Sequence, residues 1–280
     1  MNAARRRACW VSTSVEWWLR DLVPSSGVRT ALYGAPAVVD KSGLFPFRSP
    51  LTALGRPLVA PSATSRTAVR SAQRGPRVAV YVDFENARLG AAAAFQDRGP
   101  RGRVGLFDPV VLAEHLVGLG QSRRRLSAIN IYRGMPDVLR ERDAFVAAQR
   151  HVREWSNAGA CVAAFPLRYP ITWPVGRPVE KCVDVALAVD LVLQAERRMF
   201  DVAIVMSSDH DLVPALVEVI KMSGVGSPRV EVAAWQGKGS TRQRLSVPGQ
   251  RIWCHWLGEE VFRAATERRD TPSAPPRRGA

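Results

Sequence analysis

Four aspartates stand at equivalent places in the chain, because each follows an apolar run or opens the helix expected after one. They are Asp83, Asp184, Asp209 and Asp211. If the apolar runs are parallel strands, their carboxyl ends meet at one edge of the sheet and the four carboxylates converge there. Carboxylates about 4 Å apart repel by several kcal/mol at reduced dielectric. Mg²⁺ or Mn²⁺, which bind carboxylate and water oxygens, would relieve that repulsion. The pattern therefore indicates a metal site suited to phosphoryl chemistry.

Helix capping is the simpler interpretation of any one of these aspartates. An aspartate at the end of a strand is often only the N-cap of the next helix. Asp211, which directly precedes Leu212-Val213-Pro214, fits that description. The recurrence of four aspartates at matching strand ends favours the metal site over capping.

Three polar residues accompany the aspartates at short spacing. Asn86 follows Asp83 by three positions, Ser207 precedes Asp209 by two, and Lys181 precedes Asp184 by three. We expect the Asn86 and Ser207 side chains to hold the aspartates or a water by hydrogen bonds. Lys181 shares a helix face with Asp184, so it forms either an ordinary surface ion pair or a contact with a substrate phosphate.

Strands and helices alternate along the middle of the chain. Apolar runs predict strands over 77–83, 126–132, 161–165, 201–206 and 230–234. Helices are predicted from Pro109 onward and over 136–155, 181–199 and 211–222, and a strand-and-helix unit over 252–267. A loop is expected after the first strand, and prolines predict another loop before Lys181. This alternation predicts an α/β fold with a parallel sheet covered on both faces.

The charge of the chain is concentrated at its start. The net charge is +15 over 280 residues, and residues 1–77 contain 12 Lys and Arg against three acids. We expect three parts: a basic, low-complexity and largely disordered extension over 1–76, a folded domain over 77–265, and a disordered tail over 266–280. Such charge favours polyanionic partners. No apolar run is long enough to span a membrane, and cysteines without a CxxC pair predict a cytoplasmic protein without structural zinc.

Several blocks resemble one known family. VYVDFENAR around Asp83, KCVDVALAVDLV (181–192) and VMSSDHDLVPAL (205–216) resemble the signature blocks of the NYN domain. This is the LabA-like branch of the PIN-like nuclease superfamily. INIYRG (129–134) resembles the second strand of that family, and the stretch 253–262 resembles its C-terminal element.

The resemblance implies a Rossmann-like three-layer sandwich with a mainly parallel sheet, and a metal-dependent ribonuclease site. The family's functional positions fall on Asp83, Asn86, Lys181, Asp184, Ser207, Asp209 and Asp211. The sequence departs from the family pattern at Ser208, where glycine is common, and His210 fills a variable place. Neither departure removes a carboxylate.

We therefore expect a Mg²⁺- or Mn²⁺-dependent endoribonuclease with RNA as its partner. Two alternatives remain open: a catalytically silent RNA-binding or regulatory module, and a metal phosphohydrolase acting on DNA or small phosphoesters. The candidate RNA contacts are Arg88, Arg133, Arg168 and Trp173, although a solvated face or a packed loop would explain them equally. No phosphate-cradling GxxxxGK[ST] loop is present, so no nucleotide cofactor is expected. The sequence leaves homo-oligomerisation open.

Overall fold

The computed structural model describes the part of the chain that holds the predicted domain. The described residues are 75–95, 105–119, 123–222, 224, 226–237 and 243–267. The extension predicted for 1–76 and the tail predicted for 266–280 lie almost wholly outside these ranges, so both remain predictions. None of the helices within them is long and apolar enough to cross a membrane.

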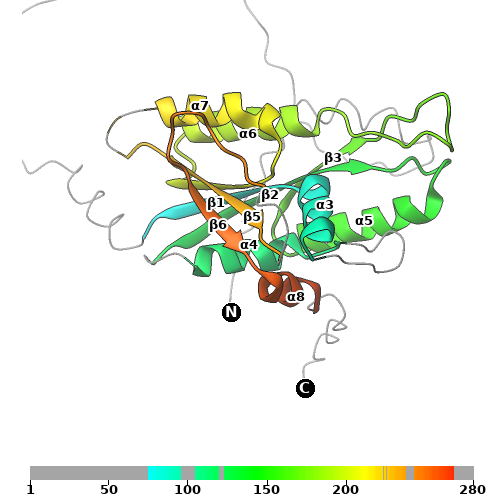
Figure 1. Cartoon of the computed structure of the whole chain (residues 1–280), viewed down its shortest axis with the longest axis horizontal. Coiled ribbons are helices and arrows are strands. Elements are labelled where there is room, and N and C mark those ends of the chain that lie inside the picture. Colours follow the sequence, from blue (N-terminus) through cyan, green and yellow to red (C-terminus); the bar gives the residue numbers. More distant parts are fainter. Residues whose placement is uncertain are drawn as a thin grey trace, which may run out of the picture. The chain divides into compact units, whose positions relative to one another are not determined.

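A six-stranded parallel sheet forms the centre of the fold (Figure 1). Its strands lie in the order β3-β2-β1-β4-β5-β6. They are β1 (Arg77–Asp83), β2 (Arg125–Met135), β3 (Cys161–Pro166), β4 (Val202–Met206), β5 (Arg229–Trp235) and β6 (Trp253–Leu257). The α/β class and the parallel sheet predicted from the sequence are confirmed.

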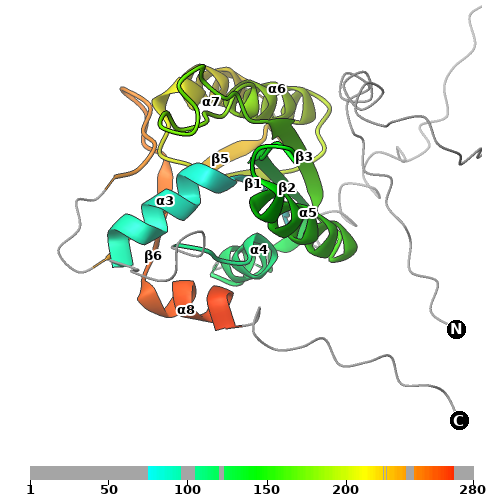
Figure 2. The same ribbon diagram turned by 90° about the vertical axis from the view of Figure 1, so that its right-hand side faces the viewer.

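Helices cover both faces of the sheet and complete three layers. They are α3 (Phe84–Phe95), α4 (Pro109–Gly118), α5 (Arg142–Asn157), α6 (Val183–Glu196), the short η2 (His210–Leu212), α7 (Val213–Lys221) and α8 (Glu259–Glu267). Figure 2 shows α6 and α7 on one side of the sheet, with α4 and α8 on the other. The helix expected from Pro109 begins there because the Asp108 carboxylate caps it, accepting the Val110 N–H at 2.9 Å.

The strand β1 is buried on both faces, as its apolar sequence requires. Val78, Val80 and Val82 pack into the layer that contains α3, α4, α5 and α8. Ala79 and Tyr81 pack into the opposite layer with α6 and α7. Successive side chains of a strand point to opposite faces, so a central strand needs apolar residues at every position.

Two predicted segments differ from the structure. The residues directly after Asp83, expected to form a loop, instead form α3 without an intervening turn. The helix expected over 136–155 begins only at Arg142. The Asp137 carboxylate accepts the N–H groups of Leu139 and Arg140 at 2.8 and 3.1 Å, which makes an aspartate turn in place of the first helical turns.

Candidate active site

The site lies where β1 and β4 end side by side. Val82 pairs with Met206, so Asp83 and Ser207 emerge next to each other at the carboxyl edge. From this point α3 turns to one face of the sheet and α7 to the other. Such a divergence of neighbouring connections opens the crevice in which parallel α/β folds bind ligands.

Asp83 is the buried centre of this edge. It is only 2% exposed. The Ser207 hydroxyl donates to its Oδ2 at 2.9 Å, and the Asn86 N–H approaches its Oδ1 at 3.4 Å. Burial, and to a lesser extent the negative charges of Asp184 and Glu180, raise the pKa of Asp83 from 3.8 to about 7, although the Ser207 hydrogen bond opposes the rise.

Ser207 and Asn86 also fix the segment that follows β4. The Ser207 hydroxyl oxygen accepts the Asp209 N–H at 3.0 Å. The Asn86 Oδ1 accepts both the N–H and the hydroxyl of Ser208, each at 3.0 Å. The hydrogen bonds predicted for Asn86 and Ser207 therefore join the start of α3 to the segment that carries Asp209. Ser208, which replaces a common glycine, takes part through its side chain.

Asp184 brings α6 to the same edge. It lies in the first turn of α6 and is partly buried. Burial first, then the negative charges of Asp209 and Asp211, raise the pKa of Asp184. Capping, the alternative considered for Asp211, is present at this edge at Asp209 instead. The Asp209 carboxylate accepts the Asp211 N–H at 2.9 Å and caps η2.

A fifth carboxylate, Glu180, was not predicted from the sequence. It accepts the Gly134 N–H, and its Oε1 would lie 2.7 Å from a Cβ at Gly134, so Glu180 lies close against the β2 backbone. Burial, together with the charges of Glu85 and Asp184, raises the pKa of Glu180. We call the five carboxylates of Asp83, Glu180, Asp184, Asp209 and Asp211 the acid edge.

The predicted basic contacts fall into two groups. Arg88 and Arg133 lie close enough to the acid edge to interact electrostatically with Glu180. Arg88 also pairs with Glu85, and the Arg133 guanidinium lies 5.2 Å from the centre of the Phe84 ring. Lys181 is exposed and forms no ion pair within the described ranges.

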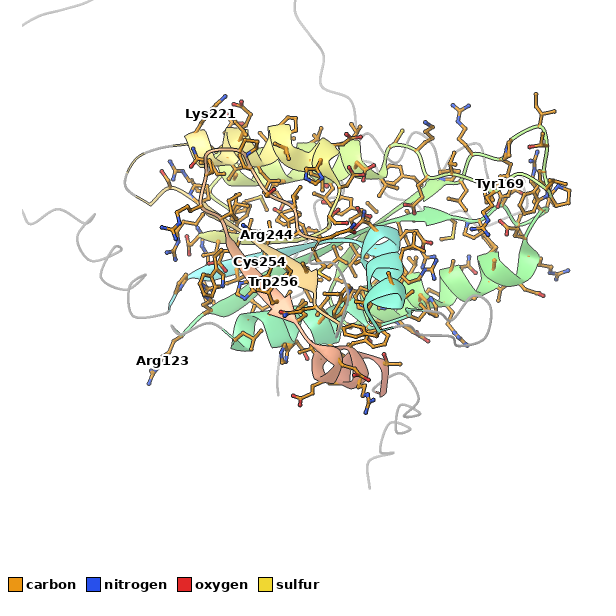
Figure 3. All side chains as sticks on the ribbon, in the orientation of Figure 1. Arg123, Tyr169, Lys221, Arg244, Cys254 and Trp256 are labelled. Carbon is orange, nitrogen blue, oxygen red and sulfur yellow. The ribbon has the colours of Figure 1, made fainter. Side chains whose placement is uncertain are left out.

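The remaining two candidate RNA contacts belong to the proline-rich loop after β3. Arg168 pairs with Val179 through the backbone, so the loop folds back on itself. The Trp173 ring packs edge-on against Tyr169 with centroids 4.9 Å apart. Figure 3 shows Tyr169 in this loop, beyond the end of β3. Trp173 thus has a partner within its own loop, and its contact with RNA stays a prediction.

The donor chemistry of the acid edge fits a hard divalent cation. Several carboxylates with raised pKa values lie together, and each suffers repulsion that a cation would remove. Within the part of the chain that the structure describes, however, no three His, Cys, Asp or Glu side chains form a group that could hold a metal ion. The donors are thus of the right kind but are not drawn together around one point.

Comparisons with known proteins identify the family of this chain. The sequence profile of the NYN domain matches residues 77–246. A comparison with curated proteins gives no match. A solved structure of a protein of unknown function from Vibrio parahaemolyticus is 14% identical, with a TM-score of 0.37, over 57% of this chain and 82% of that one. NYN domains are part of the PIN-like nuclease superfamily, which supports nuclease activity in general. Because the profile covers more than half of the chain, this protein belongs to the NYN domain family.

Proposed function

We propose that this protein is a Mg²⁺- or Mn²⁺-dependent ribonuclease that cuts RNA internally at the acid edge, and that it falls in the LabA-like branch of its family. The observation that supports this most is the state of Asp83. A carboxyl group that is 2% exposed and has a pKa of about 7 is costly to keep ionised. Such perturbed groups are concentrated at functional sites.

Each residue of the edge has a role in this proposal. Asp83, Asp184, Asp209 and Asp211 would hold the cation. When bound, the cation supplies an activated water and stabilises the charge that develops on the phosphoryl group.

The protein's own contribution is the orientation of the carboxylates. The Ser207 hydroxyl holds one oxygen of Asp83 and, through its own oxygen, the backbone of Asp209. The Asn86 side chain anchors Ser208. The exposed Lys181 lies three residues before Asp184 and is free to bind a substrate phosphate. Such fixed partners keep carboxylates in a productive geometry.

RNA as the substrate is supported by charge and by family. The chain carries a net charge of +15, most of it in residues 1–77 rather than in the folded domain, and this charge attracts polyanions. Arg88 and Arg133 flank the acid edge, where they would contact the backbone phosphates next to the cleaved bond. DNA and small phosphoesters remain the competing substrates, and the test includes both.

The test is cleavage of a labelled single-stranded RNA with Mn²⁺, with Mg²⁺ and with EDTA. We expect metal-dependent cutting by the wild type, and a loss of about 100-fold or more in Asp209→Asn. Asp143→Asn, which removes an exposed carboxylate on α5 outside the acid edge, is the matched control and should cut normally. Equal cutting by Asp209→Asn and the wild type would refute the assignment. Parallel reactions with single-stranded DNA and a nitrophenyl phosphodiester distinguish the substrates.

A silent RNA-binding module is the second candidate, and one observation favours it. No group of three metal-binding side chains is formed in the described ranges of the chain. A folded wild-type protein that binds RNA but cuts none of the substrates with either metal would establish this second function.

A further inference from the structure

A cavity adjoins the acid edge, and its lining includes none of the four aspartates proposed to hold the cation. It has a volume of about 270 Å³ and lies between α3 and the ends of β4 and β5. Its lining includes Asn86, Gly90, Ala93, Ser208, Trp235 and Gln243. We call this cavity the α3 pocket. Its volume is just below the roughly 300 Å³ at which pockets for whole small molecules begin, which suits a fragment the size of one ring system.

The walls of the α3 pocket are mixed, with polar and apolar atoms in similar shares. Gly90 and Ala93 face it from α3, and a Cβ at Gly90 would lie 3.3 Å from the Trp235 Cδ1. The Trp235 Nε1 already donates to the Ala87 carbonyl oxygen at 2.8 Å, so the indole offers no free donor to the pocket. A planar group with apolar faces and a polar edge would find partners of both kinds here.

Polar side chains that could recognise a ligand also line the α3 pocket. The Asn86 Oδ1 is occupied by Ser208, which leaves the Asn86 amide nitrogen as the group able to donate to a ligand. Gln243 adds a second amide. Apolar side chains beside amide and hydroxyl groups match a nucleobase, which has two apolar faces and a polar edge.

A second hollow continues from the pocket and differs from it in character. It has a volume of about 440 Å³ and shares Ser208 and Gln243 with the α3 pocket. Its other lining residues are His210, Arg244 and Ser246. Figure 3 shows Arg244 on the segment that leads into β6. A cationic, hydroxyl-rich surface of this kind suits a sugar-phosphate backbone.

We propose that the α3 pocket receives one unstacked nucleobase of a single-stranded RNA, while the hollow beside Arg244 follows the backbone of the same nucleotide. The inference rests on the proposed RNA substrate. The pocket lies next to Asp83, because Asn86 and Ser207 both form hydrogen bonds to that aspartate and also line the pocket. The bound base therefore belongs to a nucleotide next to the cleaved phosphate. Because a paired base could not enter the pocket, cleavage should depend on an unpaired base at that position.

The test measures RNA binding, so that it does not depend on cleavage. A fluorescent single-stranded RNA is titrated with wild-type protein in EDTA, and a single abasic nucleotide is moved along the strand. Stacking of one base in such a site is worth about 1–3 kcal/mol, so one abasic position should weaken binding by about 10-fold while its neighbours change little. A scan in which no position stands out would overturn the proposal.

A pocket-filling variant gives the second arm. Ala93 is exposed and lines the pocket, so Ala93→Leu should block it without disturbing the core. This variant should bind intact RNA about 10-fold more weakly and should lose its sensitivity to the abasic position. The matched controls are Ala93→Ser and Ala264→Leu, the latter at an exposed alanine of α8, and both should behave as the wild type. If folded Ala93→Leu binds RNA as tightly as the wild type, the proposal that the α3 pocket holds a base is wrong. If this variant does not fold, the abasic scan of the wild type decides alone.

Cleavage scored separately distinguishes this inference from the proposed function. If the protein cuts RNA but no abasic position weakens binding more than the others, the base-binding role of the α3 pocket is wrong and the nuclease proposal stands. A position-specific abasic effect without any cutting would support the pocket and contradict the nuclease.

Discussion

Replacing Asp83 by asparagine should stabilise the metal-free protein at neutral and alkaline pH, although Asp83 is the centre of the proposed site. The pKa of its carboxyl group is raised from 3.8 to about 7, mainly by burial. One pKa unit corresponds to about 1.4 kcal/mol, so a shift of roughly three units makes the ionised form cost about 4 kcal/mol. Asp83→Asn removes this cost and keeps an oxygen that can accept the Ser207 hydroxyl.

The sign of the pH dependence follows from the raised pKa. The folded protein binds this proton more tightly than the unfolded chain does, so the contribution of Asp83 to stability is greatest below pH 4. It is lost as the pH rises from about 4 to about 7. The free energy of unfolding of Asp83→Asn should therefore exceed that of the wild type by up to about 4 kcal/mol at pH 8 and differ little at pH 4.

The assay is urea denaturation in EDTA at pH 4 and pH 8, followed by tryptophan fluorescence. Asp143→Asn removes an exposed carboxylate outside the acid edge and should leave the stability close to that of the wild type at both values. If Asp83→Asn is no more stable than the wild type at pH 8, or if its advantage is the same at pH 4, the reasoning about a strained buried carboxyl is wrong.

Three further changes test contacts and backbone conformation elsewhere in the domain. Cys182 has a φ of 68°, in the left-handed region that favours glycine. The free energy of unfolding of Cys182→Gly should therefore exceed that of Cys182→Ala by about 0.5–1 kcal/mol. Equal stability of the two variants would contradict this. Arg124 donates two hydrogen bonds to the buried Glu231, at 2.7 and 2.8 Å. Glu231→Gln should therefore lower the free energy of unfolding, measured by urea denaturation, by about 3–5 kcal/mol. A decrease of less than about 1 kcal/mol would count against a structural ion pair. A Cβ at Gly237 would lie 1.7 Å from the Ala94 carbonyl oxygen, so Gly237→Ala should lower the melting temperature. Gly118 has open space around it, so Gly118→Ala should not. Equal effects of the two substitutions would contradict the close contact between Gly237 and Ala94.

The strand ends of the site could be predicted because they depend on the simplest rule of the fold. Apolar runs such as 77–83 can only be buried parallel strands in an alternating chain, and polar residues after them must lie at the carboxyl edge. Asp83, Ser207 and Asp209 are linked there by hydrogen bonds. Their role as metal ligands remains a prediction.

The helix α3 could not be found in the same way. It begins directly after β1, so no separate capping residue marks its start. Its buried residues are Phe84 and three alanines, and alanine contrasts too weakly with polar neighbours to show a helical period. The high helix propensity of the run 91–94 was the available signal.

Glu180 was missed for a different reason. It lies at the end of a loop with several prolines, for which the sequence predicts only irregular structure. Its place beside Gly134 depends on how that loop folds back onto β2, which no local pattern encodes. The α3 pocket is hidden likewise, because a cavity arises from the packing of separate elements.

The most direct test of the acid edge is Mn²⁺ binding at pH 8, measured by electron paramagnetic resonance. We predict saturable binding to the wild type and to Asp143→Asn, and an affinity at least about 10-fold weaker for Asp83→Asn. Equal Mn²⁺ affinity of Asp83→Asn and the wild type would contradict the claim that these carboxylates hold the cation.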